Sequence, residues 1–276
     1  MQVTENISEL RKMRRDQTGV FGLVPTMGAL HAGHASIIRR ARLECDHVGV
    51  SIFVNPAQFG QGEDLTKYPR TMKNDLALLE SLGVDAVWIP PPEFVYPTGY
   101  QTWITVDDVS APLEGTSRPG HFRGVATVVA KLFNIFVPNR AYFGQKDAQQ
   151  VAVIRRMAAD LNFAADIVVS PTVRETDGLA MSSRNAYLNE DERRAAPALY
   201  RALSSAKAKF ESGVRNADVL RAAVLETLSA EPRVSVQYVS VADPDTIAEL
   251  CEVRGGALLS AAVVIGKTRL IDNVLL

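Results

Sequence analysis

Two histidines, His31 and His34, lie in a glycine-containing turn, residues 24–34, with the sequence V-P-T-M-G-A-L-H-A-G-H. An apolar run at 20–24 predicts a buried strand before the turn, and the apolar spacing after His34 predicts a helix. In open parallel sheets ligands bind at such turns, and free N–H groups at a helix start attract phosphate. Gly28 and Gly33 allow a ligand to approach the backbone closely. The turn therefore predicts an anion site with two imidazole donors; the alternative is a loop with two solvated histidines.

A metal site is less favoured, because the remaining candidate ligands are scattered without ligand spacing. They are Cys45, His47, His121 and Cys251.

A second polar cluster, Gly144-Gln145-Lys146-Asp147, also follows a short predicted strand (141–143) and precedes a helical pattern. A lysine can pair with phosphate as a point charge. A cation near a helix start is unfavourable unless an anion joins it, so Lys146 indicates a phosphate contact.

Three further segments carry polar side chains that suit anions or hydroxy acids. Residues 177–185 contain hydroxyls and Arg184, which can hold phosphate or simply form a capped turn. The loop 114–124, with three cationic-capable side chains, suits an anion or internal salt bridges. After a predicted strand (48–54), Asn55 is interpreted as ordinary turn chemistry, whereas Gln58 is less needed for a turn.

The composition is that of a globular protein: 276 residues, 47% hydrophobic, 22% charged, net charge −1. The near-zero charge exerts no global pull toward nucleic acid or an anionic membrane. We expect a cytoplasmic protein, because two distant cysteines do not form a disulfide framework and no signal or membrane-spanning pattern is present.

Strands and helices are predicted to alternate up to about residue 172, and helices followed by strands come after it. This pattern predicts an α/β fold: a Rossmann-like parallel-sheet domain (1–172) and a smaller α+β C-terminal domain (173–276). Other expectations are a helix from Thr71 to Leu82 carrying a solvated Asp75, an edge strand at 102–106, and a helical stretch at 189–210.

Six ordered sequence blocks cover most of residues 20–190. They are P-T-M-G-A-L-H-x-G-H (25–34), V-N-P-x-Q-F (54–59), E-D-L-x-x-Y-P-R (63–70), R-P-G-H-F-R-G-V (118–125), F-G-x-K-D-x-Q-Q (143–150) and D-G-L-A-M-S-S-R-N (177–185). With these blocks in this order, the chain resembles the pantoate–β-alanine ligase (pantothenate synthetase) family, within the nucleotidyltransferase superfamily.

The resemblance implies a two-step reaction. Pantoate's carboxylate attacks the α-phosphorus of ATP, giving pantoyl adenylate and pyrophosphate, and β-alanine then displaces AMP to give pantothenate. It further implies Mg²⁺, a homodimer, and a C-terminal domain that closes over the nucleotide. Partners are expected to be these small molecules, with no nucleic acid and no membrane.

The resemblance also implies roles for individual residues. His34, His31 and Lys146 are the expected catalytic residues, and Gln58 and Gln150 are expected to hold pantoate, with Gln58 close to β-alanine. The expected ATP contacts are Met27, Gly28, Ala29, Leu30, His31, Ala32, Gly33, His34, Gly144, Gln145, Lys146, Asp147, Val173, Met181, Ser182, Ser183 and Arg184.

Asp75 matches an acid associated with Mg²⁺ in the family. Two departures stand out: Gln145 where the family usually has Glu, with a small expected effect, and Asn74 where some relatives carry a second acid.

Two other functions remain open at this point. A cofactor adenylyltransferase of the same superfamily would release pyrophosphate without AMP, but a phosphate acceptor favours Arg or Lys over a glutamine pair. A nucleotide-binding regulator built on a decayed enzyme conflicts with the intact His31, His34, Lys146 and Arg184.

Overall fold

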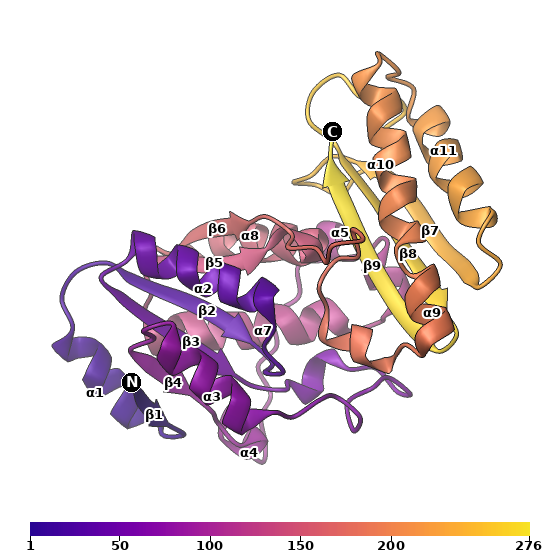
Figure 1. The fold of residues 1–276 in the computed structure, drawn as a ribbon. Coiled ribbons are helices and arrows are strands. Elements are labelled where there is room, and N and C mark those ends of the chain that lie inside the picture. The colour runs from indigo at the N-terminus through magenta and orange to yellow at the C-terminus, as the bar shows by residue number, and fades with distance from the viewer. The chain divides into compact units, whose positions relative to one another are not determined.

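The computed structural model describes every residue from 1 to 276, and these residues form two compact units that are described separately. The first comprises Met1–Gly144 and Val153–Ser170, and the second comprises Gln145–Ala152 and Pro171–Leu276 (Figure 1). The expected domains 1–172 and 173–276 stay a prediction. The compact units differ from them mainly because Gln145–Ala152 packs with the second unit.

A six-stranded parallel sheet forms the centre of the first unit. Its strands are β1 (Gln2–Thr4), β2 (Phe21–Thr26), β3 (His47–Ile52), β4 (Ala86–Trp88), β5 (Arg140–Gly144) and β6 (Asp166–Ser170). Their spatial order is β1-β4-β3-β2-β5-β6. From β2 onward this is the doubly wound order, in which the winding reverses between β2 and β5. The carboxyl ends of these two strands therefore flank the position where such folds bind ligands.

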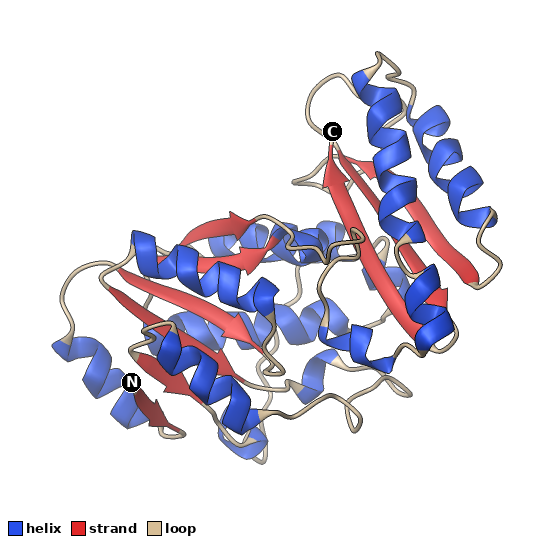
Figure 2. Cartoon of the chain, in the orientation of Figure 1, coloured by secondary structure: helices blue, strands red, loops and turns tan.

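Helices cover both faces of this sheet, which explains why its strands read as continuous apolar runs (Figure 2). Val24 in β2, Ile38 in α2 and Leu79 in α3 share one buried cluster. Phe21 and Trp88 contact Phe136 of α7 from their strands. The helical segments are α1 (Ile7–Asp16), α2 (Ala32–Glu44), η1 (Pro56–Gln58), α3 (Met72–Ser81), α4 (Pro92–Val95), α5 (Asp107–Ser110), α6 (Glu114–Ser117), α7 (His121–Phe136) and α8 (Ala148–Asp160), the last of which runs from the second unit into the first.

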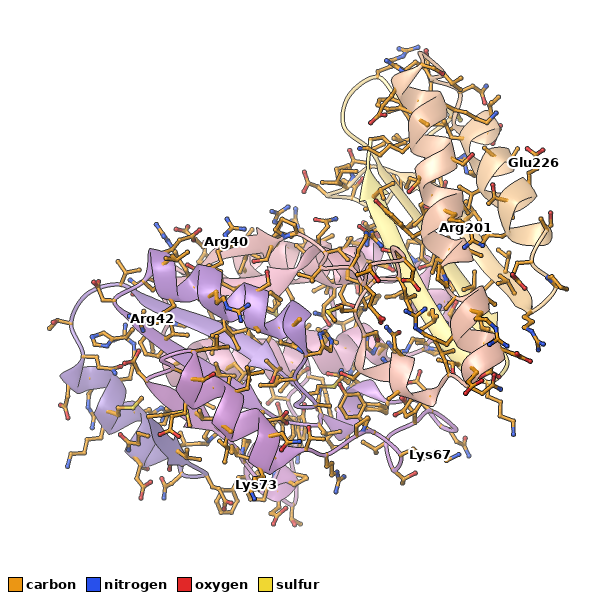
Figure 3. All side chains as sticks on the ribbon, viewed as in Figure 1. Arg40, Arg42, Lys67, Lys73, Arg201 and Glu226 are labelled. Atoms are coloured by element: carbon orange, nitrogen blue, oxygen red, sulfur yellow. The ribbon has the colours of Figure 1, made fainter.

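An ion pair secures α2 near its carboxyl end, where Figure 3 labels Arg42. Arg42 pairs with Asp85 at 2.7 Å and donates to the backbone oxygens of Cys45 and Asp46. A cation at this end of a helix offsets the negative end of its dipole. The carboxyl end of α2 is thus fixed, and the amino end of the same helix begins directly after His31.

The second unit is an antiparallel sheet covered by helices. Strands β7 (Val234–Ala242), β8 (Leu258–Ile265) and β9 (Thr268–Leu275) lie in chain order, so β9 is an edge strand. Its helices are η3 (Ser183–Tyr187), α9 (Glu190–Ala195), α10 (Ala198–Glu211) and α11 (Ala217–Ser229). Leu199 and Leu203 of α10, Leu220 of α11 and Leu259 of β8 belong to its buried core.

The fold class is confirmed, but two local predictions are wrong. Residues 102–106 form no strand, because the Ile104 N–H donates to the Thr127 hydroxyl (3.0 Å) instead of to a neighbouring strand. The stretch 189–210 is two helices, since Pro197 has no N–H to continue the helical ladder. No helix is both long enough and apolar enough to cross a membrane.

Candidate active site

The turn between β2 and α2 is an ordered helix cap built from its two histidines. His31 is the N-cap of α2, and its Nδ1 accepts a hydrogen bond from the Gly33 N–H (3.1 Å). His34 Nδ1 accepts from the His31 N–H (3.3 Å), and the two ring centroids are 4.1 Å apart. The same imidazoles that were predicted to bind phosphate therefore also start the helix.

These cap bonds determine which ring nitrogen carries the proton. Because Nδ1 of His31 and of His34 accepts a backbone N–H, a neutral ring must hold its proton on Nε2. The first turn of α2 contains no acidic residue to compete with an anion. The turn thus combines two Nε2–H donors with the positive end of a helix.

Asp75 of α3 binds the backbone of this turn. Its side chain is only 2% exposed, and its carboxylate accepts the N–H groups of Ala29 and Leu30, both at 2.9 Å. The Thr71 hydroxyl donates to the same carboxylate at 3.0 Å rather than capping α3. Ala29 has a φ of 50°, a conformation that a non-glycine residue adopts only when its surroundings stabilise it. The expectation of a solvated acid at Asp75 is therefore wrong.

The expected association of Asp75 with Mg²⁺ would have to coexist with its hydrogen bonds to the turn. Both carboxylate oxygens already accept hydrogen bonds from the turn, and the side chain is buried. No group of three or more His, Cys, Asp or Glu side chains is arranged to hold a metal ion. Mg²⁺ usually keeps several waters and binds one or two carboxylates plus substrate phosphates. The magnesium requirement, with Asp75 as its expected ligand, stays a prediction.

Gln58 lies against the start of the same turn. Its Nε2 is 3.1 Å from the Met27 sulfur, and its Oε1 accepts from Asn55 Nδ2 at 3.1 Å. Asn55 in turn accepts from the Tyr96 hydroxyl at 2.8 Å and donates to the Gly124 carbonyl at 3.1 Å. Asn55 does cap η1, as a turn residue would, but it also orients the Gln58 amide.

A partly buried ion-pair network fixes the backbone of Gln58. Arg118 binds Glu63 through two hydrogen bonds of 2.8 Å and contacts His121 Nε2 at 3.1 Å. His121 Nδ1 lies 2.8 Å from the Gln58 carbonyl oxygen, so it donates there and Nε2 accepts. Burial, and then the neighbouring Arg118, lower the pKa of His121 to about 4. The loop 114–124 was expected to bind an anion or to form internal salt bridges. Arg118 forms an internal salt bridge, with Glu63.

Gly124 permits close contact between α7 and the Gln58 segment. A Cβ at this position would lie 2.3 Å from the Ala57 carbonyl oxygen and 2.6 Å from the Gln58 nitrogen. Any side chain at residue 124 would therefore displace the segment that carries Gln58.

The second unit holds the remaining predicted contacts. Gln145, Lys146 and Asp147 form η2 directly after β5, and Lys146 pairs with Asp147 at 3.0 Å. Gln150 is half-buried in the first turn of α8.

A hairpin in this unit, whose two arms pair at Arg174 and Ala180, carries the other expected nucleotide contacts. The Val173 carbonyl accepts the Met181 N–H at 3.0 Å, joining these two positions. The Ser182 hydroxyl caps η3 by accepting the Arg184 N–H at 3.2 Å, and Ser183 begins that helix.

The structure thus groups the predicted residues into two sets. Gln58 and Asp75 contact the turn of Met27–His34 within the first unit, where Gly144 ends the strand beside β2. The residues of η2, Gln150 and the hairpin belong to the second unit.

Sequence reasoning missed the groups that support these residues, namely Asn55, Glu63, Arg118 and His121. Arg118 and His121 lay in the predicted loop 114–124, and Asn55 lay in a predicted turn. The available signal was that all four fall inside the family-like blocks.

Together these features define a doubly wound α/β protein whose histidine-capped turn lies at the topological switch point of the sheet. The sequence profile of the pantoate-beta-alanine ligase family matches residues 2–275. Pantothenate synthetases are similar over the whole chain: 58% identity in Roseiflexus castenholzii, covering 100% of this chain and 99% of the relative, and 54% in Herpetosiphon aurantiacus, covering 100% of both.

Solved structures are similar as well. Pantothenate synthetase from Thermus thermophilus superposes with a TM-score of 0.95 at 45% identity, covering 99% of both chains. The pantoate-beta-alanine ligase from Francisella tularensis, described as complexed with beta-gamma ATP and beta-alanine, gives 0.82 at 36% identity, covering 100% of this chain and 97% of that one. The chain belongs to the pantoate–β-alanine ligase family.

Replacing Asp75 with Asn should disturb the turn, because an amide offers one acceptor oxygen to two N–H groups. We expect Asp75→Asn to lower the free energy of unfolding by about 1–3 kcal/mol and to reduce turnover at least about tenfold. Urea unfolding and steady-state rates measure both. Thr71→Val is the matched control, since it removes the third hydrogen bond and leaves both turn contacts. Unchanged stability together with a raised magnesium requirement would instead support a metal-ligand role.

The neutral His121 should make folding stability sensitive to acid. Its folded pKa is about 4, below the ordinary 6.5, so the unfolded chain binds the proton first as pH falls. This contribution to stability is complete above pH 6.5 and is lost as pH falls toward 4. Between pH 7 and 4.5 the wild type should lose about 2–3 kcal/mol more than His121→Gln, measured by urea unfolding. Parallel losses in both proteins would contradict a neutral, buried His121.

Proposed function

We propose that this protein ligates pantoate and β-alanine to pantothenate at the expense of ATP, releasing AMP and pyrophosphate. The observation that carries this proposal is the helix-capping H-x-G-H turn beside Gln58, at the switch point of a chain that matches the ligase family almost end to end. The Francisella relative's description as complexed with beta-gamma ATP and beta-alanine supports the substrate assignment.

In the first step a pantoate carboxylate oxygen forms a bond to the α-phosphorus of ATP. The bond from the α-phosphorus to the bridging oxygen breaks, and pyrophosphate leaves with that electron pair. Such transfers depend mainly on positioning and on compensation of negative charge. His31 and His34 supply Nε2–H donors, the start of α2 supplies backbone N–H groups, and Lys146 and Arg184 supply positive charge.

Gln58 and Gln150 bind pantoate. An amide can both donate to a carboxylate and accept from a hydroxyl, which suits a hydroxy acid. A fixed cation at either position would stabilise the carboxylate and weaken its attack. The hydrogen bond from Asn55 holds the Gln58 oxygen, so its amide is oriented before substrate arrives.

In the second step the β-alanine amine attacks the acyl carbon of pantoyl adenylate. The carbon–oxygen bond to AMP breaks, AMP leaves with one oxygen that began in the carboxylate, and the amine loses its proton as the amide forms. Closing the second unit over the site protects the acyl adenylate from water. The remaining predicted ATP contacts, Met27–His34, Gly144–Asp147, Val173 and Met181–Arg184, belong to this proposal.

Several finer features are also proposals. We expect Mg²⁺ to accompany the ATP phosphates, and a homodimer, which sedimentation would measure. A cytoplasmic location fits the two unpaired thiols, Cys45 and Cys251. Gln145 and Asn74 are expected to have little effect on the reaction.

A coupled assay distinguishes the ligase from the two alternative functions. With ATP, magnesium and pantoate we expect pyrophosphate, and AMP equal to the pantothenate formed only after β-alanine is added. Pyrophosphate with a phosphorylated acceptor and no AMP would identify an adenylyltransferase. Tight ATP binding with no turnover on any acceptor would identify a regulator.

Variants of His34 separate its helix-capping role from its chemical role. In His34→Asn the side-chain oxygen can replace Nδ1 as the cap acceptor, while the Nε2 donor is lost; we expect a normal unfolding curve and turnover reduced about 10²–10³-fold. In His34→Gln the amide nitrogen approximates Nε2, so turnover should exceed that of His34→Asn. Wild-type rates in His34→Asn would remove this histidine from the mechanism.

A further inference from the structure

Two adjacent polar residues near the end of β9, Asp272 and Asn273, are buried although the proposed reaction uses neither. They are 3% and 4% exposed. Neighbouring side chains of a strand point to opposite faces of the sheet, so Asp272 and Asn273 point to opposite faces at this edge strand. Buried polar groups are costly unless they are hydrogen-bonded, which makes their partners informative.

Asn273 binds the backbone of η2 on one side. Its Nδ2 donates to the carbonyl oxygens of Gln145 (3.0 Å) and Lys146 (2.9 Å). Its Oδ1 accepts from Gln145 Nε2 at 3.0 Å. The Asn273 amide therefore fixes two consecutive backbone carbonyls, and these determine the position of the Lys146 Cα and Cβ atoms. The departure at Gln145 takes part in the same contact, since an amide there can donate to Asn273.

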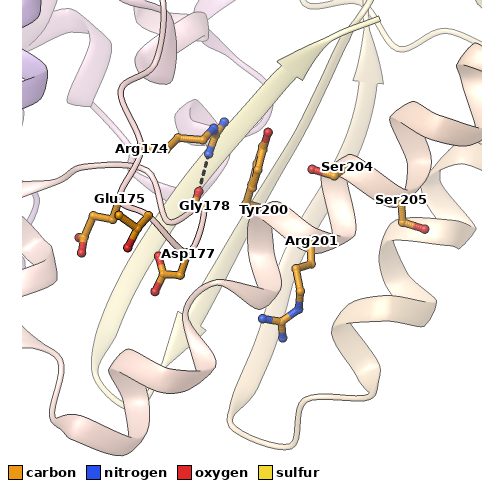
Figure 4. A pocket seen from close by; sticks show the side chains of 9 residues that line it. Arg174, Glu175, Asp177, Gly178, Tyr200, Arg201, Ser204 and Ser205 are labelled. Atoms are coloured by element: carbon orange, nitrogen blue, oxygen red, sulfur yellow. Dashed lines mark hydrogen bonds between the residues drawn. The ribbon is translucent and has the colours of Figure 1, made fainter.

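Asp272 binds Arg174 on the other side through two hydrogen bonds of 2.5 and 3.0 Å. The guanidinium also lies 3.7 Å from the Tyr200 ring centroid of α10. Figure 4 shows Arg174 beside Tyr200 and donating to the Gly178 carbonyl oxygen, at 3.1 Å. A bidentate pair that is also stacked has little freedom to turn.

Arg174 transmits this restraint to the hairpin. It follows Val173 directly and bridges to Ala180 across the hairpin, next to the hydrogen bond between Val173 and Met181. The hairpin leads into Ser182–Arg184, the expected phosphate contacts. The same strand thus holds η2 through Asn273 and the hairpin through Asp272.

We propose that Asp272 and Asn273 are positioning residues that use β9 as a common support for the two nucleotide-binding segments of the second unit. This inference rests on the proposed function only in assigning ATP to Lys146 and Val173. A purely structural role would lower stability without a selective effect on the nucleotide.

The test compares Asn273→Asp and Asn273→Ala with wild type in the full-length enzyme. Both remove the two N–H donors, and Asp adds a negative charge facing two carbonyl oxygens, so Asp should be worse. For Asn273→Ala we expect the dissociation constant of a non-hydrolysable ATP analogue, and the KM for ATP, to rise about tenfold, with the KM for β-alanine changed less than about twofold. Amide hydrogen exchange over 145–150 should be faster in both variants before ATP is added.

Arg269→Ala is the matched control, because Arg269 lies on the same strand and pairs with the side chain of Gln237. It should leave both ATP affinity and exchange at 145–150 unchanged. If Asn273→Asp does not fold, Asn273→Ala still tests the loss of donors without added charge. Unchanged ATP affinity and exchange in a folded Asn273→Ala protein, even one with lowered Tm, would overturn the inference.

Direct ATP binding separates this outcome from a failure of the proposed function. If wild type binds ATP but makes no pantothenate, and Asn273→Ala still weakens ATP binding, the ligase assignment fails while the positioning role stands. If the enzyme makes pantothenate and the variant binds ATP normally, the positioning role fails alone.

Discussion

The site in the first unit depends on one interaction, the contact between the Asp75 carboxylate and the N–H groups of Ala29 and Leu30. These two donors lie where the chain leaves β2 and turns with a positive φ at Ala29. Without the carboxylate they would be partly buried donors without that acceptor, and the left-handed residue would lose the contact that offsets its strain. The placement of His31, His34 and the start of α2 follows from this contact.

A similar arrangement, a buried polar side chain that fixes a neighbouring group, recurs at two other segments that carry predicted site residues. Asn55 and the neutral His121 fix the side chain and the carbonyl of Gln58, and Asn273 fixes the carbonyls of Gln145 and Lys146. Side chains that bind backbone in this way set positions before substrate is present. Charge compensation in phosphoryl transfer is most effective when donors need no rearrangement, so in the proposed reaction we expect these supports to raise the rate.

Local patterns were sufficient to predict the residues at strand ends. Three predicted polar groups each follow an apolar run that forms a parallel strand: the H-x-G-H turn, the glutamine after the next strand and the lysine after β5. The carboxyl ends of parallel strands lie at one edge of the sheet, where ligands bind. Asp75 was misjudged because an acid on an amphipathic helix is usually solvated, and only tertiary structure brings a turn 45 residues away onto it. Asn273 lies 127 residues from Lys146, a distance over which periodicity carries no information. The broken helix at Pro197 was a local error, since proline chemistry was visible in the sequence.

In the proposed reaction, pantoate's carboxylate attacks the α-phosphorus of ATP in a site arranged around the H-x-G-H turn. The most direct measurement follows oxygen rather than rate. Pantoate labelled with ¹⁸O in its carboxylate would be turned over with ATP and β-alanine, and the AMP and pyrophosphate analysed by mass spectrometry. We expect one ¹⁸O atom in AMP for each pantothenate formed and none in pyrophosphate. Label in pyrophosphate or inorganic phosphate, or unlabelled AMP, would show that pantoate is activated by another route.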